Sequence, residues 1–250
     1  YIPCFVCKFY SILKRKPLII TWLEFIDWNE MRLEFLGKLV EKLTIKLTKN
    51  NLVLSKNTNK LKSSFCLLPP GIDLNKIKNS SQNKEKFDII FVGRLIKDKK
   101  VDMLFNSARG LKLKICIIGD GPEKSNLIKL AYDLKLNVTF KGFLDKEEEV
   151  YSYMKSSNIF VLPSIREGFG IVILEALACG CKIITTNHHY NNSKELVDPN
   201  FICDPDIGSL REKIKFSLED RYQNKINLKD YEINNIALKL EKYYRNVNEA

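Results

Sequence analysis

The sequence predicts an α/β protein whose main domain is a doubly wound parallel sheet, and three observations predict it. Apolar, β-branched runs alternate with amphipathic stretches from residue 87 to about residue 220. Several of these runs are apolar on both faces, as strands buried in a parallel sheet are. The chain has 250 residues, of which 45% are hydrophobic and 28% charged, so it can build the core of one large domain or two modest ones.

The predicted elements follow a recurring unit of apolar run, turn and amphipathic stretch. The strands are short runs rich in isoleucine, leucine and valine, and they cover 18–21, 52–55, 87–93, 113–119, 137–142, 159–163 and 182–186. The helices carry apolar residues at helical spacing, and they cover 31–48, 100–109, 122–135, 146–156, 170–179, 207–219 and 230–247.

A domain boundary is predicted in the Pro-Pro-Gly turn and the polar, lysine- and asparagine-rich run that cover residues 69–86. Residues 1–68 offer two clear strands and one long helix, too little to close an α/β domain of their own. We therefore predict a partial first domain with its linker at 1–78 and a complete domain at 84–222. The last segment, 223–250, is predicted to be a helix that packs back toward the N-terminal part.

Composition excludes some classes of protein. No apolar run approaches the roughly 18 residues that span a bilayer, and no signal peptide is evident. The chain begins at Tyr1 without a methionine, which hints at a missing upstream segment. Formal net charge is +11, and residues 1–70 carry 12 basic and five acidic side chains. Such a segment attracts anionic lipid, nucleic acid or phosphate-bearing substrates, but a solvated lysine-rich surface explains it equally well.

Specific nucleic-acid or metal sites are not indicated. The sequence has neither zinc-finger spacing nor an RNA-binding aromatic motif, so no nucleic-acid partner is expected. The seven cysteines lie mostly in apolar stretches, which favours reduced thiols in a cytoplasmic protein. Cys4 and Cys7 form a lone CxxC pair, and the only histidines are His188 and His189. A zinc site is therefore not expected, and a loop role is favoured for the two histidines.

In an open parallel sheet, ligands bind beyond the carboxyl ends of the strands. After the run 87–93, Gly93 and Arg94 are followed by Lys97, Lys99 and Lys100, and this arrangement suits a diphosphate. The competing interpretation, a solvated charge run, is favoured for Lys97 and Lys100.

Two further strand ends carry glycines. Gly119 and Gly121 frame a turn in which Pro122 takes the first helical position, and a plain structural turn is the favoured interpretation. Gly168 and Gly170 precede a helix whose free N–H groups could hold a phosphate. That helix, from Ile171 to Ala178, is apolar at every position except Glu175, so it is predicted to be buried. A buried carboxylate needs strong hydrogen-bond donors, and vicinal sugar hydroxyls would serve.

The same segments resemble the retaining glycosyltransferases of the GT-B fold known as glycosyl transferases group 1. Its signature is two glutamates separated by seven residues, here Glu167 and Glu175 in EGFGIVILEALACG. VGRLIKDKKVD resembles the group's GRLxxxK element, and IIGDGPE, VTFKGFL and KIITTN…KELV follow in the group's order. The resemblance is strong over residues 65–220, and it implies a Rossmann-like C-terminal domain plus a partial second Rossmann-like domain.

The resemblance implies roles for individual residues. Arg94 and Lys99 would neutralise the diphosphate of a nucleoside diphosphate sugar, and Glu167 would contact the transferred sugar. Glu175 would accept hydrogen bonds from the ribose hydroxyls. The remaining donor-binding residues would be Gly93, Gly142 and Phe143, with Gly168, Phe169, Gly170 and Ile171 near sugar and phosphate. Such enzymes usually need no metal or other cofactor.

Three departures from the group's pattern stand out. The first glycine-rich loop of the acceptor domain is absent, so the acceptor domain is expected to be truncated. Leu23 stands where a histidine is common, although Glu24 remains, and Pro70 replaces a usual asparagine.

The leading hypothesis is transfer of a hexosyl unit to an unknown glycan, lipid or small-molecule acceptor. The alternative is a non-catalytic or partner-completed donor-binding module. Lys14, Arg15 and Lys16 leave open a peripheral contact with an anionic membrane at its cytosolic face.

Overall fold

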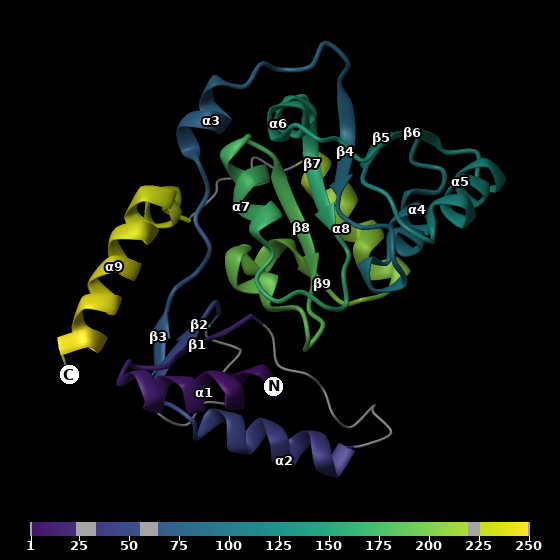
Figure 1. Ribbon diagram of the computed structural model, residues 1–250. Coiled ribbons are helices and arrows are strands. Elements are labelled where there is room, and N and C mark those ends of the chain that lie inside the picture. Colours follow the sequence, from purple (N-terminus) through teal and green to yellow (C-terminus); the bar gives the residue numbers. More distant parts are fainter. Residues whose placement is uncertain (1, 24–33, 56–64, 220–225, 250) are drawn as a thin grey trace. The chain divides into compact units, whose positions relative to one another are not determined.

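The computed structural model describes residues 2–23, 34–55, 65–219 and 226–249 (Figure 1). The chain divides into two compact units, unit 1 (Tyr1–Gly71 with Ile233–Ala250) and unit 2 (Ile72–Glu232). The division falls inside the stretch in which the sequence predicts a boundary.

Unit 2 contains a six-stranded, all-parallel sheet in the order β6-β5-β4-β7-β8-β9. The strands are β4 (Phe87–Val92), β5 (Lys114–Ile118), β6 (Asn137–Gly142), β7 (Ser157–Leu162), β8 (Lys182–Thr186) and β9 (Ile202–Cys203). In chain order this is 3-2-1-4-5-6, the order of a doubly wound Rossmann-like sheet. The predicted fold class is confirmed.

Helices cover both faces of this sheet (Figure 1). On one face α3 (Leu74–Asn79), α6 (Glu147–Lys155) and α7 (Ile171–Ala178) contact one another. On the other, α4 (Val101–Ala108) contacts both α5 (Lys124–Asp133) and α8 (Ile207–Glu219). Because both faces are covered, the middle of each central strand is apolar, and Ile89, Ile90 and Phe91 of β4 are fully buried. Short 3₁₀ helices complete the unit: η3 (Lys97–Lys99), η4 (Asn192–Leu196), η5 (Pro199–Phe201) and η6 (Leu228–Tyr231).

Unit 1 contains a three-stranded parallel sheet in the order β1-β2-β3. Its elements are α1 (Ile2–Lys14), β1 (Ile19–Trp22), α2 (Glu34–Ile45), β2 (Asn50–Val53), β3 (Phe65–Leu67) and the C-terminal helix α9 (Ile233–Glu249). Helix α9 places Ile236 in a buried cluster with Leu52 and Leu68. None of the helices in the described residues is long and apolar enough to cross a bilayer.

Among the strands and α-helices of the described residues, four were not predicted from the sequence. Strands β3 and β9 have three and two residues, too short to show a pattern. Helix α3 lies inside the predicted linker, where Asp73 caps it by accepting a hydrogen bond from the N–H of Lys76, and its Ile77 is buried. Helix α1 is amphipathic, with Lys8 and Ser11 on one side and Val6, Phe9 and Leu13 on the other, but it was not identified from the sequence. The first residues of the predicted helix 31–48 lie outside the described residues, and so does Glu24.

Candidate functional site

The strand order reverses between β4 and β7, and the loops that leave these two strands meet beyond the sheet. The N–H of Ile165, after β7, donates to the carbonyl oxygen of Asp98, after β4, at 2.9 Å. Ligands of open α/β sheets bind in the crevice at such a switch point. The two loops that meet here carry Arg94, Lys99 and Glu167, the three residues predicted to be catalytic.

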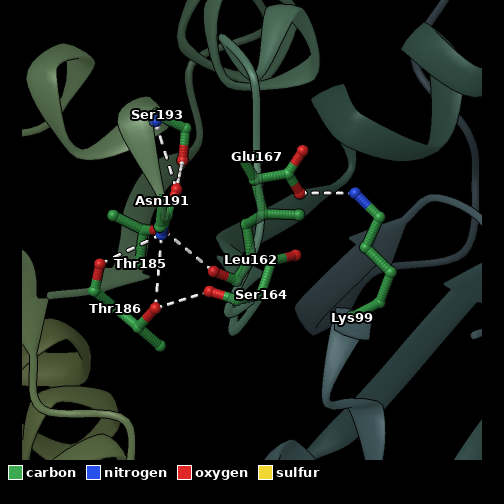
Figure 2. A network of polar contacts seen from close by, with 8 residues as sticks. All are labelled: Lys99, Leu162, Ser164, Glu167, Thr185, Thr186, Asn191 and Ser193. Atoms are coloured by element: carbon green, nitrogen blue, oxygen red, sulfur yellow. Dashed lines mark hydrogen bonds and ion pairs between the residues drawn. The ribbon is translucent and has the colours of Figure 1, made fainter. Parts of the chain in front are cut away.

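An ion pair joins the two loops. Lys99 Nζ lies 2.6 Å from Glu167 Oε1, and the side chains are only 15% and 11% exposed (Figure 2). A pair this well shielded from solvent interacts more strongly than a surface pair, but each charge depends on the other for compensation. The sequence predicts that both residues face the site, but it does not predict that they bind each other.

Arg94 and Gly93 follow β4 directly. The Arg94 side chain is exposed to solvent and does not pack in the core. The backbone of Gly119 packs closely against Gly93, so a Cβ on Gly119 would lie 2.0 Å from the carbonyl oxygen of Gly93. The N–H of Gly93 also donates to the carbonyl of Ile118. The turn at Gly119 therefore has a structural role, as the favoured interpretation predicts.

The second glycine-containing loop leads into α7. Gly170 is the N-cap residue with φ of +81°, and a Cβ there would lie 2.4 Å from the Cβ of Ser193. Phe169 is buried, with its ring centroid 6.2 Å from that of Tyr231. Gly168 is half-buried, and Ile171 is partly exposed at the start of the helix. Only glycine fits at Gly170, since its φ is positive and Ser193 fills the space of a Cβ.

Helix α7 is not buried all round, contrary to the prediction. Ile173, Leu174, Ala176 and Leu177 are buried, whereas Ile171, Glu175 and Ala178 form a stripe that is at least partly exposed. Glu175 lies on this open stripe, about one turn into the helix.

Glu175 has a hydrogen-bond donor that the sequence did not indicate. The O–H of Tyr151 on α6 donates to Glu175 Oε1 at 3.1 Å. Burial nevertheless raises the pKa of Glu175 above its ordinary value of 4.5, and the Tyr151 hydrogen bond offsets only part of that rise. One hydrogen bond from Tyr151 does not exhaust the acceptor capacity of the carboxylate, which has two oxygens.

Gly142 and Phe143 end β6, the edge strand two positions from β4. Gly142 has φ of +73°, and its carbonyl accepts from the N–H of Gly119 at 2.7 Å. Phe143 is 72% exposed, so its ring is available for stacking. At about 4.8 Å per strand, these residues lie roughly 10 Å from the end of β4.

A polar network at the end of β8 was missed from the sequence. Asn191 is fully buried and hydrogen-bonds Thr185, Thr186 and Ser193 (Figure 2). The available signal was the run NNS a few residues after a strand end, at the edge of the sheet where the other site residues lie.

The histidines lie beside this network. The ring centroids of His188 and His189 are 4.4 Å apart, and the guanidinium of Arg166 lies over the ring of Tyr190 at 5.4 Å. Burial lowers the pKa of His188, and His189 lowers it further. Among the described residues, no group of three histidine, cysteine, aspartate or glutamate side chains could hold a metal ion.

The cysteines are free thiols. Cys116, Cys181 and Cys203 are fully buried, and burial raises the pKa of the Cys116 and Cys203 thiols to about 12. Thiols in this environment stay protonated and pack as small apolar groups.

Comparison with known proteins gives consistent matches. The sequence model of the family Glycosyl transferases group 1 matches residues 73–235. An N-acetylgalactosaminyltransferase of Campylobacter jejuni that acts on a diphospho-undecaprenol-linked sugar is 34% identical over 154 residues, covering 57% of this chain and 41% of its own length. The O-antigen biosynthesis glycosyltransferase WclY of Escherichia coli is 38% identical over 96 residues, covering 37% and 26%. The chain thus spans less than half the length of these relatives.

Solved structures match nearly the whole chain. HepE of Anabaena, solved with UDP and glucose, has a TM-score of 0.78 at 17% identity and covers 97% of this chain and 75% of its own. The sucrose-phosphate synthase of Thermosynechococcus elongatus has a TM-score of 0.79 at 20% identity and covers 95% and 70%. At this identity the likeness establishes the fold.

Proposed function

The chain belongs to the glycosyl transferases group 1 family, and on that premise we propose that it transfers a hexosyl unit from a nucleoside diphosphate sugar with retention of anomeric configuration. The observation that carries this proposal is the shielded Lys99–Glu167 pair at the switch point of the sheet. A donor-binding module without turnover is not favoured, because the matched family and relatives are named for transfer.

The donor would extend along the carboxyl edge of the sheet. The diphosphate lies at Arg94 and Lys99, where two cations meet the end of β4. The base lies at Gly142 and Phe143, roughly 10 Å away, and the exposed Phe143 ring offers a stacking surface. Glu175 accepts the ribose hydroxyls alongside the Tyr151 hydrogen bond. The roughly 10 Å between the ends of β6 and β4 is within the reach of a nucleoside diphosphate.

Catalysis in this proposal is mainly electrostatic. Cleavage of the bond between sugar and diphosphate builds negative charge on the departing phosphate, and preorganised cations stabilise that charge. Arg94 is exposed, and Glu167 holds Lys99 in place until the diphosphate binds. The incoming diphosphate competes with Glu167 for Lys99 and frees the carboxylate to contact the transferred sugar, beside the amides of Phe169, Gly170 and Ile171. Retention follows if the acceptor attacks from the side of the departing phosphate.

We propose that these cations do the work without a metal ion or other cofactor. The chemistry of the loops supports this, since Arg94 and Lys99 already supply two positive charges where the phosphates would lie. Turnover should be unchanged by EDTA. A large loss that added Mg²⁺ or Mn²⁺ restores would contradict this part of the proposal.

For the acceptor, we propose a glycan or a lipid-linked sugar in the cytoplasm, at the membrane face. The C. jejuni relative is named for a diphospho-undecaprenol-linked substrate. In unit 1, helix α1 exposes Val6, Phe9 and Leu13, and basic residues lie at its C-terminal end: Lys14 in the last turn, then Arg15 and Lys16. Apolar side chains beside basic ones suit an anionic bilayer. Vesicle flotation should show binding to anionic but not to neutral vesicles, and equal binding to both would contradict the charge argument.

The donor site is tested by calorimetry against UDP, GDP, ADP and their sugars. For the nucleotide that binds, Arg94→Ala and Glu175→Ala should each weaken affinity about 10- to 100-fold, the range for a lost hydrogen bond to a charged group. Lys97→Ala is the matched control, because this exposed cation in the same loop was assigned to solvent. Unchanged affinity in both variants would refute the site.

The stereochemistry is tested on the same material. With any donor that binds, donor hydrolysis or transfer should release a sugar whose anomeric configuration, read by NMR immediately after turnover, matches that of the donor. An inverted product would refute retention while leaving the donor site in place.

A further inference from the structure

Asn191 is a fully buried polar residue for which the proposed chemistry has no use. It lies between the end of β8 and η4, with 0% of its surface exposed. A buried amide must find partners for two N–H groups and one oxygen, so its contacts show which groups it holds in place.

The contacts of Asn191 fix the orientation of its amide. Oδ1 accepts from the N–H of Ser193 at 3.1 Å and from its hydroxyl at 2.5 Å. Nδ2 donates to the carbonyl of Thr186 and to the hydroxyl oxygens of Thr185 and Thr186, at 3.0 to 3.2 Å. A carbonyl can only accept and a backbone N–H can only donate, so no flipped amide would satisfy this set.

The two threonines extend the network to the neighbouring strand. Since each hydroxyl accepts from Asn191, each can donate its own hydrogen elsewhere. Thr185 Oγ1 donates to the carbonyl of Leu162 at 2.9 Å, and Thr186 Oγ1 donates to that of Ser164 at 2.6 Å (Figure 2). Asn191 is thereby linked to the end of β7, where the Glu167 loop begins.

The turn that Asn191 shapes also holds Glu167 directly. The N–H of Glu167 donates to the carbonyl of Tyr190, and the N–H of Asn192 donates to the carbonyl of Glu167, both at 3.0 Å. Glu167 and Asn191 form an isolated parallel bridge. Ser193, whose position Asn191 fixes, fills the space against Gly170. Both ends of the Glu167 loop therefore rest on residues that Asn191 orders.

We propose that Asn191 is a positioning residue for Glu167: it fixes the β8–η4 turn that sets the backbone of Glu167, so that the carboxylate reaches Lys99 in the free protein and the transferred sugar in the complex. This inference rests on the proposed function for the role of Glu167 toward the sugar. Aspartate cannot replace Asn191, because it lacks both N–H donors and would bury a charge beside the Thr186 carbonyl.

The first test is hydrogen exchange on the full chain with Asn191→Asp. The amides of Glu167 and Asn192 should exchange at least about 10-fold faster than in the wild type. The matched control is Asn51→Asp, since Asn51 is equally buried but lies in unit 1, between Trp22 and Thr48. It should accelerate exchange in unit 1 only. If the Glu167 amide exchanges as slowly in Asn191→Asp as in the wild type, the proposal is wrong.

The second test separates positioning from general destabilisation. With the nucleotide that binds in the donor screen, Asn191→Asp should weaken affinity for the nucleoside diphosphate sugar about 10-fold. It should not weaken affinity for the nucleoside diphosphate, because the diphosphate competes with Glu167 for Lys99. In a Glu167→Gln background the same change should have no further effect, because Asn191 acts through Glu167. Equal losses for both ligands, or additive losses in the double variant, would overturn it.

Two variants of Thr186 test the network if Asn191→Asp does not fold. Thr186→Ser keeps the hydroxyl and should retain wild-type behaviour, whereas Thr186→Val removes it and should reproduce the loss for the sugar donor. Identical behaviour of the two variants would count against the network. If the wild type binds no nucleotide, the proposed function fails, and hydrogen exchange alone then decides whether Asn191 holds Glu167.

Discussion

Unit 2 and unit 1 are both built on parallel strands, but they bury their apolar side chains to very different extents. The central strand of unit 2 has three consecutive residues with no exposed surface, Ile89, Ile90 and Phe91. In unit 1 the strands have three or four residues, and large apolar side chains lie on the surface of its helices. Phe9 on α1 is 67% exposed and Phe35 on α2 is 82% exposed.

The difference separates the part of the chain that supports the donor site from the part that offers apolar surface. In unit 2 the polar residues of the site lie at strand ends, and the buried sheet beneath them fixes those ends. In unit 1 the exposed apolar side chains contribute little to folding and are available for contacts. Equivalent substitutions in the two units should therefore have unequal consequences.

The largest expected effect is that of removing a core aromatic. Phe91→Ala should destabilise unit 2 by about 3–5 kcal/mol, because it leaves a large cavity under the site. Phe9→Ala on α1 should change stability by less than about 0.5 kcal/mol, as exposed substitutions do. Trp22 is buried in unit 1, and the other tryptophan of the sequence is Trp28, so urea unfolding followed by tryptophan fluorescence monitors that unit. Hydrogen exchange of β4 and β5 amides monitors unit 2.

The contrast between the units would be refuted if the two substitutions cost the same free energy of unfolding. The loss for Phe9→Ala is read from the fluorescence transition, and the loss for Phe91→Ala from the exchange of β4 amides. Such a result would mean that α1 is packed more tightly in solution than its exposed surface indicates.

A smaller effect is expected at the glycines of unit 2. Gly119→Ala should destabilise the unit by about 3 kcal/mol, because its Cβ would lie 2.0 Å from a backbone oxygen at φ of +130°. Gly110→Ala is the matched control: φ is +77° there, but nothing lies within 4 Å of a Cβ, so the expected cost is about 1 kcal/mol. If Gly119→Ala and Gly110→Ala accelerate the exchange of β4 and β5 amides equally, the close approach of Gly119 to Gly93 does not constrain the strand ends.

The sequence predicted the fold of unit 2 well because its signals are local and repeated. Strands buried on both faces read as continuous apolar runs, and β6 and β8 have the predicted bounds. Strand β9 has two residues, and its pairing with β8 depends on the returning chain, so it leaves no sequence pattern. Helix α3 was hidden by its polar composition, and its one buried residue, Ile77, does not make a stripe.

The sequence names candidate residues for the site but does not indicate the partners that the structure gives them. Arg94, Lys99 and Glu167 stand out because charges at strand ends are conspicuous in an apolar pattern. The partners Tyr151 and Asn191 come from a helix and a turn that only the fold brings near, so their roles depend on long-range packing. The prediction that α7 is buried all round was wrong, since composition cannot show that Ile171, Glu175 and Ala178 are only partly covered.

The smallest expected effect concerns Glu175 itself. Because burial raises the pKa of this carboxyl above 4.5, the unfolded chain loses the proton first as pH rises, and the wild type loses stability until the raised pKa is passed. Glu175→Gln keeps an acceptor for Tyr151 and has no proton to lose. Its free energy of unfolding should match that of the wild type below pH 4.5 and exceed it at pH 7. The exposed Glu149→Gln on α6 is the control, and its curve should run parallel to that of the wild type.

The same substitution should weaken donor binding about 10-fold, because a neutral amide accepts hydrogen bonds from ribose less strongly than a carboxylate does. A variant that is more stable at pH 7 and poorer at binding would mean that unit 2 keeps a destabilising charge for its ligand. If Glu175→Gln is more stable than the wild type but binds the donor equally well, the buried charge is destabilising and Glu175 is not part of the donor site. In that case the open stripe of α7 would have a different occupant.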